Sequence, residues 1–386
     1  MGKRIYLDYN STTPVDKLVV EAMLPTFSEN FGNPSSENHD TGLSAREMVE
    51  MARAQVAGIV NMRPRDVIFT SGATEANNLA IHGMAAGADG PFRAAVSGTE
   101  HKSVLEPYGH LKGAEVRYIT VSGDGLPEMD WLSGIPRGSL DIISVMAANS
   151  ETGVIAPMKE ITELAHEKEA LVHCDATQAV GKIPFDAGEI DMVTFSSHKI
   201  YGPKGCGALV ATKEARRRMA GVIHGGGQED GLRSGTLNVP AIIGFGAACD
   251  IAASEGLEDA QRQEKLRDRF EYALVKAVPD TTINGKGAPR IPNTSSFRMA
   301  GAIADAVIVN APEIEIATGS ACSSSTMEPS HVMVAMGLDR DAAGECLRVS
   351  VGRQTTEEDV NTAVESLSKA ARFIRGKEAE IAGAVS

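Results

Sequence analysis

The chain has 386 residues, 42% of them hydrophobic and 23% charged, which is enough for two or three domains with substantial cores. A formal net charge of −14 opposes direct binding to nucleic acid or to an anionic membrane. The most apolar stretch, residues 239–249, is far shorter than the ~20 residues of a membrane span. The N-terminus lacks the apolar segment of a signal peptide, so we expect no membrane association.

The five cysteines are odd in number, widely scattered and nowhere spaced as CxxC. This pattern argues against a disulfide framework and against a structural metal site, and it favours a reducing, cytoplasmic compartment. The five are Cys174, Cys206, Cys249, Cys322 and Cys346.

The N-terminal segment IYLDYNSTTPVD combines a short extended run with turn residues, so it could cross from one domain to another. A strand, a Ser-Gly turn and a helix are expected over residues 67–83. Gly72 permits the turn, and the backbone amides of Ala73 and Thr74 should be unpaired at the helix start, where they could bind an anion. The alternative is that Ser71 or Thr74 caps the helix.

Polar residues follow two further apolar strands. The strand in RAAVSG leads to TEHKSV and places His101 at the start of a helix, where a lone histidine is commonly a cap or a surface residue. The strand in LDIISVMAANSETG ends in Asn149, Ser150 and Glu151. Polar residues at such strand ends are expected to face a ligand.

The strongest chemical signal lies between residues 171 and 207. A strand over residues 171–174 ends at Asp175, and a strand over residues 192–196 leads to Lys199. Strands alternating with helices predict a parallel sheet, whose carboxyl ends meet at one ligand site. A lysine and a carboxylate delivered there suit pyridoxal phosphate (PLP), because the amine can form a Schiff base and the carboxylate can keep the ring nitrogen protonated. The alternative is an ordinary ion pair.

A glycine-rich loop, HGGGQEDGLRSGT, spans residues 224–236 and contains neither GxGxxG nor GK[ST]. With Arg233, Ser234 and Thr236 it could grip a phosphate, or it could be a plain surface loop. Residues 239–276 form a long, mostly helical connector that we expect to contain a domain boundary. The remaining chain alternates short strands and helices.

Nine segments occur in the order found in the cysteine desulfurases, a branch of the class V, fold-type I PLP enzymes, which the chain therefore resembles over nearly its whole length. They are LDYNSTTPVD, GNPSS, TSGATEANNLAI, TEHKSV, DATQAVGKIP, SSHKIYGPKG, GGGQEDGLRSGT, TGSACSSS and RVSVGR. The resemblance implies an α/β fold with a mainly parallel seven-stranded sheet in a large PLP-binding domain, residues 14–255. A smaller α+β domain, residues 1–13 and 256–386, would carry the cysteine loop.

The resemblance also assigns roles around the cofactor ring. Lys199 would hold PLP as a Schiff base and move protons on the substrate carbon. Asp175 would pair with the ring nitrogen, Gln178 would hydrogen-bond the ring hydroxyl, and His101 would stack on the ring and assist proton transfer. The residues expected at the cofactor phosphate are Ala73, Thr74, Ser196, His198 and, from the neighbouring subunit of a homodimer with shared sites, Thr236.

Substrate contacts are implied in the same way. Arg348 would bind the substrate carboxylate, for which its planar fork is suited, or else form a structural ion pair. The family commonly has Asn-Asn-Glu where this chain has Asn149-Ser150-Glu151, so Asn149 and Ser150 are both candidates for the substrate contact.

By resemblance, Cys322 would attack the sulfur of L-cysteine, keep it as a persulfide and release L-alanine. Its small, polar neighbours favour an exposed and accessible thiol, whereas the other four cysteines suit structural positions. A sulfur-acceptor protein would then serve iron–sulfur assembly, tRNA thiolation or DNA phosphorothioation. TGSACSSS resembles desulfurases with a long cysteine loop, including those that supply DNA phosphorothioation.

Two alternatives stay open at this stage. One is another class V PLP enzyme, such as a selenocysteine lyase or an aminotransferase, of which the aminotransferase needs no nucleophilic cysteine. The other is a non-catalytic protein that relays sulfur between partners. The presence of Lys199, Asp175, His101 and Cys322 together argues against the second alternative.

Overall fold

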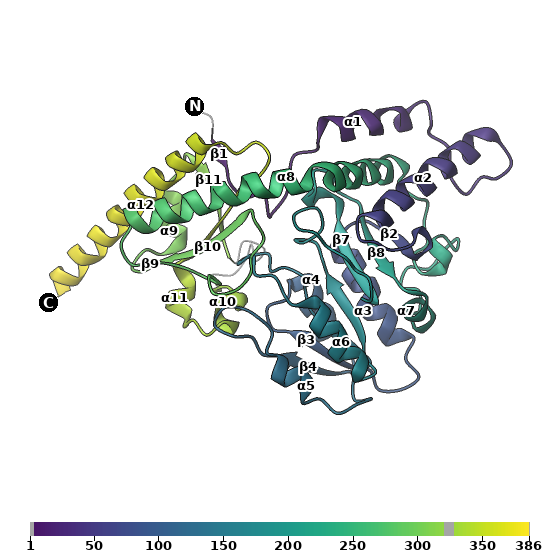
Figure 1. Ribbon diagram of the computed structural model, residues 1–386, viewed down its shortest axis with the longest axis horizontal. Helices are drawn as coiled ribbons and strands as arrows, with labels where there is room; N and C mark the ends of the chain where they lie inside the picture. The colour runs from purple at the N-terminus through teal and green to yellow at the C-terminus, as the bar shows by residue number, and fades with distance from the viewer. Residues whose placement is uncertain (1–3, 320–327, 386) are drawn as a thin grey trace.

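The computed structural model describes residues 4–319 and 328–385, with side chains described through residue 377. A seven-stranded sheet with the order β2-β8-β7-β6-β5-β3-β4 forms its centre (Figure 1). Every neighbouring pair is parallel except the two that involve β8, which is antiparallel to β2 and to β7. The predicted α/β fold with a mainly parallel seven-stranded sheet is thus confirmed. The strands are β2 (Val67–Thr70), β3 (Arg93–Ser97), β4 (Glu115–Ile119), β5 (Ile142–Ser144), β6 (Leu171–Asp175), β7 (Met192–Ser196) and β8 (Gly207–Ala211).

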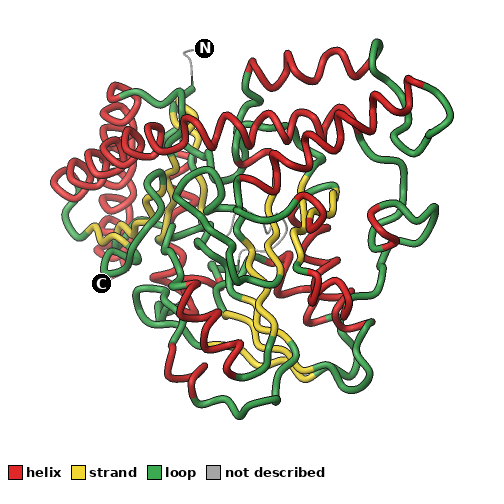
Figure 2. The backbone as a smooth tube through the Cα atoms, turned by 45° about the vertical axis from the view of Figure 1, so that its right-hand side comes forward, coloured by secondary structure: helices red, strands yellow, loops and turns green. Residues whose placement is uncertain are grey.

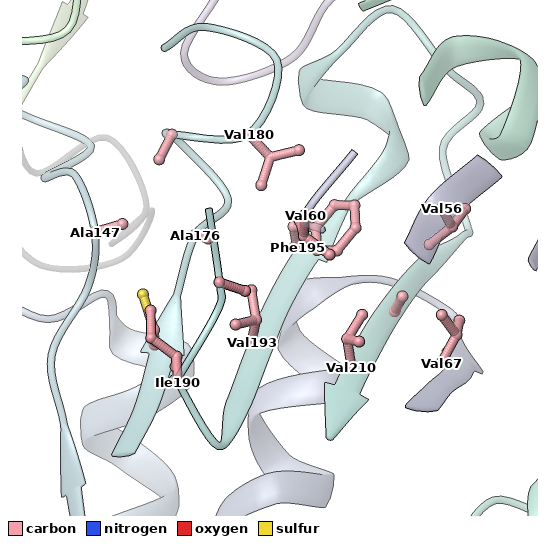
Figure 3. Close-up of a cluster of buried hydrophobic side chains, with 14 of the residues drawn as sticks. Val56, Val60, Val67, Ala147, Ala176, Val180, Ile190, Val193, Phe195 and Val210 are labelled. Atoms are coloured by element: carbon pink, nitrogen blue, oxygen red, sulfur yellow. The ribbon is translucent and has the colours of Figure 1, made fainter. Parts of the chain in front are cut away.

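Helices cover both faces of this sheet, because successive strand residues point to opposite sides and both sides are apolar. One cluster joins Ile68 and Leu209 to Leu79 and Tyr108, which belong to the helices α3 (Ala73–Ala86) and α4 (Lys102–Gly109). The other cluster joins the opposite sides of the same strands to α2 (Asp40–Gly58), α6 (Met158–Glu167) and the first part of α8. Figure 3 shows this second cluster, in which Val193, Phe195 and Val210 of the paired strands β7 and β8 lie together with Val56 of α2.

A second, smaller unit contains a four-stranded antiparallel sheet in the order β12-β13-β10-β9 and the parallel pair β1-β11. Leu7, Phe297 and Leu347 lie in its separate hydrophobic cluster. The strands are β1 (Ile5–Tyr6), β9 (Thr281–Ile283), β10 (Thr294–Met299), β11 (Ile314–Glu315), β12 (Ala317–Thr318) and β13 (Cys346–Ser350). The helices are α9 (Ala304–Val309), α10 (His331–Ala335), α11 (Arg340–Gly344) and α12 (Glu357–Val385).

The helix α8 (Val239–Ala277) is a single 39-residue element that belongs to both units. Phe245 packs in the core of the large sheet, whereas Phe270 and Leu274 pack in the core of the smaller unit. Figures 1 and 2 show the helix running from one unit to the other. The two cores support the boundaries at residues 13/14 and 255/256, which stay a prediction.

The remaining elements are short and belong to the large unit. They are α1 (Lys17–Met23), α5 (Met129–Ser133), α7 (Lys213–Arg218) and the 3-10 turns η1 (Leu24–Phe27), η2 (Pro64–Asp66), η3 (Ser197–Lys199) and η4 (Glu229–Gly231).

No helix in the described ranges combines the length and the apolar character needed to cross a membrane.

Candidate active site

A cavity of about 440 Å³ lies at the carboxyl ends of β6 and β7. Its size is within the range of small-molecule sites, and its position is the ligand-binding edge of an open α/β sheet. Most of the site residues predicted from the sequence meet there. Those on its wall are Ala73, Thr74, His101, Ser150, Asp175, Gln178, Ser196, His198, Lys199 and Arg348.

Lys199 reaches the cavity from the short turn η3 that follows β7. Its Nζ donates to the backbone carbonyl oxygens of Asn10 and Ser11, each at 2.6 Å. The N-terminal segment therefore holds the amine in the cavity wall, although it lies almost 190 residues away along the chain.

Asp175 is the last residue of β6 and is buried. Its Oδ1 accepts a hydrogen bond from the backbone N–H of Thr177 at 3.0 Å, and its Oδ2 accepts one from Asn77 Nδ2 at 2.9 Å. An ionised carboxylate can accept more than these two bonds. Asp175 is thus held in place with capacity left for a donor in the cavity.

Asn77, which the sequence analysis did not select, connects Asp175 to the residues beneath His101. It is fully buried on α3, and its Nδ2 also donates to Ser103 Oγ at 2.9 Å. Its Oδ1 accepts from Thr194 Oγ1 and lies 3.2 Å from His173 Nε2. Asn77 follows Ala73 and Thr74 by four and three residues, so helical spacing places it on the same face, and this signal could have identified it.

His101 caps α4, as its alternative role anticipated, and its side chain also lines the cavity. Its Nδ1 accepts the backbone N–H of Ser103 at 3.1 Å and contacts Ser103 Oγ at 2.7 Å. Burial lowers the pKa of His101 below its usual value, although the Asp175 carboxylate opposes the shift. Near neutral pH the imidazole is therefore uncharged, with its Nδ1 acting as an acceptor.

The turn before α3 has the form of an anion site. Within the described chain no side chain caps the N-terminus of α3, which excludes the simple capping alternative and leaves the first-turn amides without a side-chain acceptor. Gly72 has φ +155°, and a Cβ on Gly207 would lie 2.7 Å from the Gly72 Cα, so both positions require glycine. Ser196 and His198 lie on the same cavity wall.

His198 is uncharged near neutral pH. Burial, reinforced by the nearby Lys199 and Lys204 ammonium groups, lowers its pKa to about 4. Its Nδ1 lies 3.0 Å from Thr12 Oγ1. The ring can therefore act as a neutral hydrogen-bonding partner for a ligand.

Arg348 reaches the cavity from β13 of the smaller unit and forms the ion pair anticipated as its alternative role. Its Nη2 lies 2.5 Å from Asp8 Oδ1, and its Nη1 donates to the backbone carbonyl of Ser150 at 2.9 Å. Arg348 Nε is buried without a partner among the described residues. The guanidinium is thus both ion-paired and exposed to the cavity.

Asn149 and Ser150 differ in their positions. Ser150 lines the cavity, but Asn149 is not among the lining residues. The Asn149 Oδ1 accepts the backbone N–H groups of Glu151 and Thr152, and its Nδ2 donates to the Thr99 carbonyl. Its amide therefore shapes the turn, and the geometry favours Ser150 for a substrate contact.

Besides Asn149, one further predicted residue within the described ranges does not line this cavity. Thr236 is exposed at the end of the glycine-rich loop. Cys322 lies outside the described residues. Gly319, the last described residue before it, lines an adjoining cavity of about 400 Å³ that shares His101, Ser150 and Arg348 with the first.

The sequence analysis missed several residues of the wall. Asn10 and Ser11 come from the N-terminal segment, and Lys204 and Gly205 follow Lys199. All four belong to segments that carry the family resemblance, LDYNSTTPVD and SSHKIYGPKG. Their presence in these segments could have identified them as candidate site residues.

Comparison with known proteins agrees with this geometry. The family model described as aminotransferase class-V matches residues 5–362. The chain belongs to this family. Its members depend on PLP, and the cavity presents a lysine, a carboxylate and an uncapped helix N-terminus of the kind that this cofactor requires.

Proteins named cysteine desulfurase are among the similar sequences. The cysteine desulfurase IscS of Anaeromyxobacter sp. (strain Fw109-5) is 41% identical, over 96% of this chain and 93% of the relative. A cysteine desulfurase of Frankia sp. (strain EuIK1) is 44% identical, over 96% of this chain and 92% of the relative.

Solved structures show the same fold. A NifS-like protein matches with a TM-score of 0.88 and 35% identity, over 96% of this chain and all of the other. DndA from Streptomyces lividans matches with a TM-score of 0.76 and 35% identity, over 88% of this chain and 97% of the other.

Proposed function

We propose that this protein is a cysteine desulfurase that converts L-cysteine to L-alanine and passes the sulfur to an acceptor protein. The observation that carries the proposal is the meeting of Lys199, Asp175 and His101 at one cavity beside Arg348. Relatives named cysteine desulfurase over nearly the whole chain support the reaction type.

The described residues fit PLP, which supplies an electron-accepting ring when bound. Lys199 would hold the cofactor covalently, Asp175 would accept a hydrogen bond from its ring nitrogen, and Gln178 would donate one to its ring hydroxyl. The phosphate would lie at the start of α3, where it meets backbone amides and a helix dipole. The residues proposed to hold it are Ala73, Thr74, Ser196 and His198, with Thr236 from the partner subunit.

Substrate binding would fall to Arg348 and Ser150. The guanidinium of Arg348 matches a carboxylate geometrically, and a bound substrate would compete with Asp8 for it. Lys199 would move the proton at the substrate Cα, and the neutral His101 would accept the proton of the substrate thiol. A general acid or base of this kind contributes about 10²–10⁴ in rate.

Cys322 would carry the sulfur. Its sulfur bonds to the substrate sulfur, the substrate carbon–sulfur bond breaks, and the carbon gains a proton and leaves as L-alanine. Atoms and electrons balance without an external oxidant. The acceptor would be a protein of iron–sulfur assembly, tRNA thiolation or DNA phosphorothioation. The desulfurase itself would be a cytoplasmic homodimer.

The decisive experiment exposes the purified holoprotein to L-cysteine and examines the Cys322 peptide by mass spectrometry. We expect one added sulfur on that peptide and L-alanine in solution, and neither with L-serine. Cys322→Ser should reduce sulfide release in the presence of a reductant by at least 10²-fold. Undiminished sulfide release by Cys322→Ser would exclude the persulfide mechanism and favour the other class V reactions.

A further inference from the structure

Besides Lys199 and Lys204 on the wall, a further lysine lies beside the active-site cavity and has no part in the reaction described above. Lys182 lies in the turn that follows β6 and is partly buried. Its Nζ donates to Gln178 Oε1 and, at 3.1 Å, to Asn10 Oδ1. Both of these partners are neutral amide oxygens, and both residues line the cavity.

The contact with Lys182 determines which way the Gln178 amide faces. Because Oε1 accepts from Lys182, the nitrogen Nε2 occupies the other position and donates to the Asn10 carbonyl at 3.0 Å. An amide nitrogen carries two hydrogens, so one N–H of Gln178 remains for a ligand. With the amide reversed, Gln178 would present an oxygen to the ligand and to the Asn10 carbonyl.

Asn10 is the second residue that Lys182 holds. The Asn10 carbonyl oxygen accepts both Lys199 Nζ at 2.6 Å and Gln178 Nε2 at 3.0 Å. Its side-chain Oδ1 also accepts from Asn293 Nδ2 at 3.0 Å, which ties it to the smaller unit. Lys182 therefore contacts Asn10, whose carbonyl accepts the Lys199 amine, and Gln178, which donates to that same carbonyl.

We propose that Lys182 is a positioning residue that holds Gln178 and Asn10 so that an N–H faces the cofactor hydroxyl and a carbonyl faces Lys199. This inference rests on the proposed function, since it requires PLP in the cavity. A lysine suits the role because its amine donates hydrogen bonds whether or not it is protonated. Burial, together with the charges of Lys199 and Arg348, lowers the pKa of Lys182.

The test compares Lys182→Met with Lys159→Met, a matched change on α6 whose side chain is 89% exposed. PLP is titrated into each apoprotein, and the absorption of the bound cofactor is followed against pH. Lys182→Met should weaken PLP binding about tenfold, the effect of one lost hydrogen bond. The pH midpoint of the absorption change should rise, because a missing Gln178 donor destabilises the ionised ring oxygen. Lys159→Met should match the wild type in both measurements.

Two further variants separate positioning from a general structural effect. In a Gln178→Ala background, adding Lys182→Met should change the pH midpoint no further, because Gln178 transmits the effect. Lys182→Gln keeps an N–H donor without the charge and should restore part of the affinity. It also carries the test if Lys182→Met fails to fold.

The two proposals can fail separately. Wild-type affinity and pH midpoint in Lys182→Met, or a full additional shift in the Gln178→Ala background, would overturn the positioning role alone. A wild-type protein that binds no PLP or forms no L-alanine from L-cysteine would overturn the proposed function itself.

Discussion

Asn77 holds Asp175 through one hydrogen bond, and the same side chain satisfies several buried polar groups around it. Asn77→Ala would remove partners of Asp175 Oδ2, Ser103 Oγ and Thr194 Oγ1 in a region without exposed surface. Each unsatisfied buried group costs about 1–3 kcal/mol, so we expect a loss of roughly 2–4 kcal/mol in the free energy of unfolding. The released carboxylate should also lower the rate per folded molecule by at least tenfold.

Denaturant unfolding and a turnover assay on the same preparation measure the two effects. The neighbouring Asn78 provides the control, because its Nδ2 donates to the Thr74 carbonyl on the exposed surface of the same helix. Asn78→Ala should therefore change the free energy of unfolding by at most about 0.5 kcal/mol. Equal effects of the two substitutions would show that the buried network does not hold Asp175.

Local sequence predicted Asp175 and Lys199 on the cavity wall better than it predicted the residues that support them. Asp175 ends β6, and Lys199 lies in the turn directly after the neighbouring parallel strand β7, so the sheet brings them to the same edge. Asn10 contacts Lys199 from 189 residues away, and no local periodicity encodes such a contact. The contacts of Arg348 with Asp8 and Ser150 also join distant segments, which local sequence cannot predict. Arg348 was therefore assigned from the family resemblance.

At the scale of elements, the short helix α10 is attached to the turn after β5 through one buried carboxyl. Ser330 caps α10 by accepting the N–H groups of Val332 and Met333, and its hydroxyl donates to Glu151 Oε2 at 2.5 Å. Burial raises the pKa of Glu151 to about 7. One hydrogen bond therefore joins α10, which follows the Cys322 segment in the sequence, to a carboxyl that titrates near neutral pH.

The sign of this pH effect follows from proton linkage. Glu151 binds its proton more tightly in the folded state, so the free energy of unfolding should fall as the pH rises from about 4.5 to about 7. A shift of this size corresponds to a penalty on the order of 3 kcal/mol above pH 7. Glu151→Gln keeps a neutral side chain of the same shape and should avoid that penalty.

We therefore expect Glu151→Gln to be more stable than the wild type at pH 8 and close to it at pH 4.5. Thermal or denaturant unfolding across this range measures the difference. Glu160→Gln, at an exposed position on α6, should show no such pH dependence. A constant difference between Glu151→Gln and the wild type at every pH would mean that Glu151 ionises at its usual pH.

At the scale of the whole molecule, the sequence predicted that the boundary between the two units lies inside a helical segment. The structure shows why no turn or loop in the sequence marks that boundary. The helix α8 continues without interruption from a core containing Phe245 to a core containing Phe270. Helical periodicity alone does not distinguish which core a buried residue faces. The sequence also predicted that the N-terminal segment could pass from one domain to the other. Its hydrogen bonds, through Asn10, to Asn293 and Ser350 could be identified only from the folded structure.

The exposed position of Thr236 bears on the proposed homodimer. Thr236 lies off the cavity wall of its own chain, so its proposed phosphate contact requires a second subunit. Three large apolar side chains within residues 24–31 are also each more than half exposed, as expected of a surface that another copy covers. They are Leu24, Phe27 and Phe31.

Mixed dimers test this arrangement directly. Thr236→Ala should weaken PLP binding about tenfold through one lost phosphate contact, and Lys199→Ala should abolish turnover. When the two variants are unfolded together and refolded, a mixed dimer would contain one site with an intact Lys199 from one subunit and an intact Thr236 from the other. At PLP concentrations that leave Thr236→Ala mostly unloaded, the mixture should therefore turn over L-cysteine faster than the two variants measured separately. If the mixture gives only the sum of the separate rates, or if light scattering shows a monomer, Thr236 does not act across a subunit boundary.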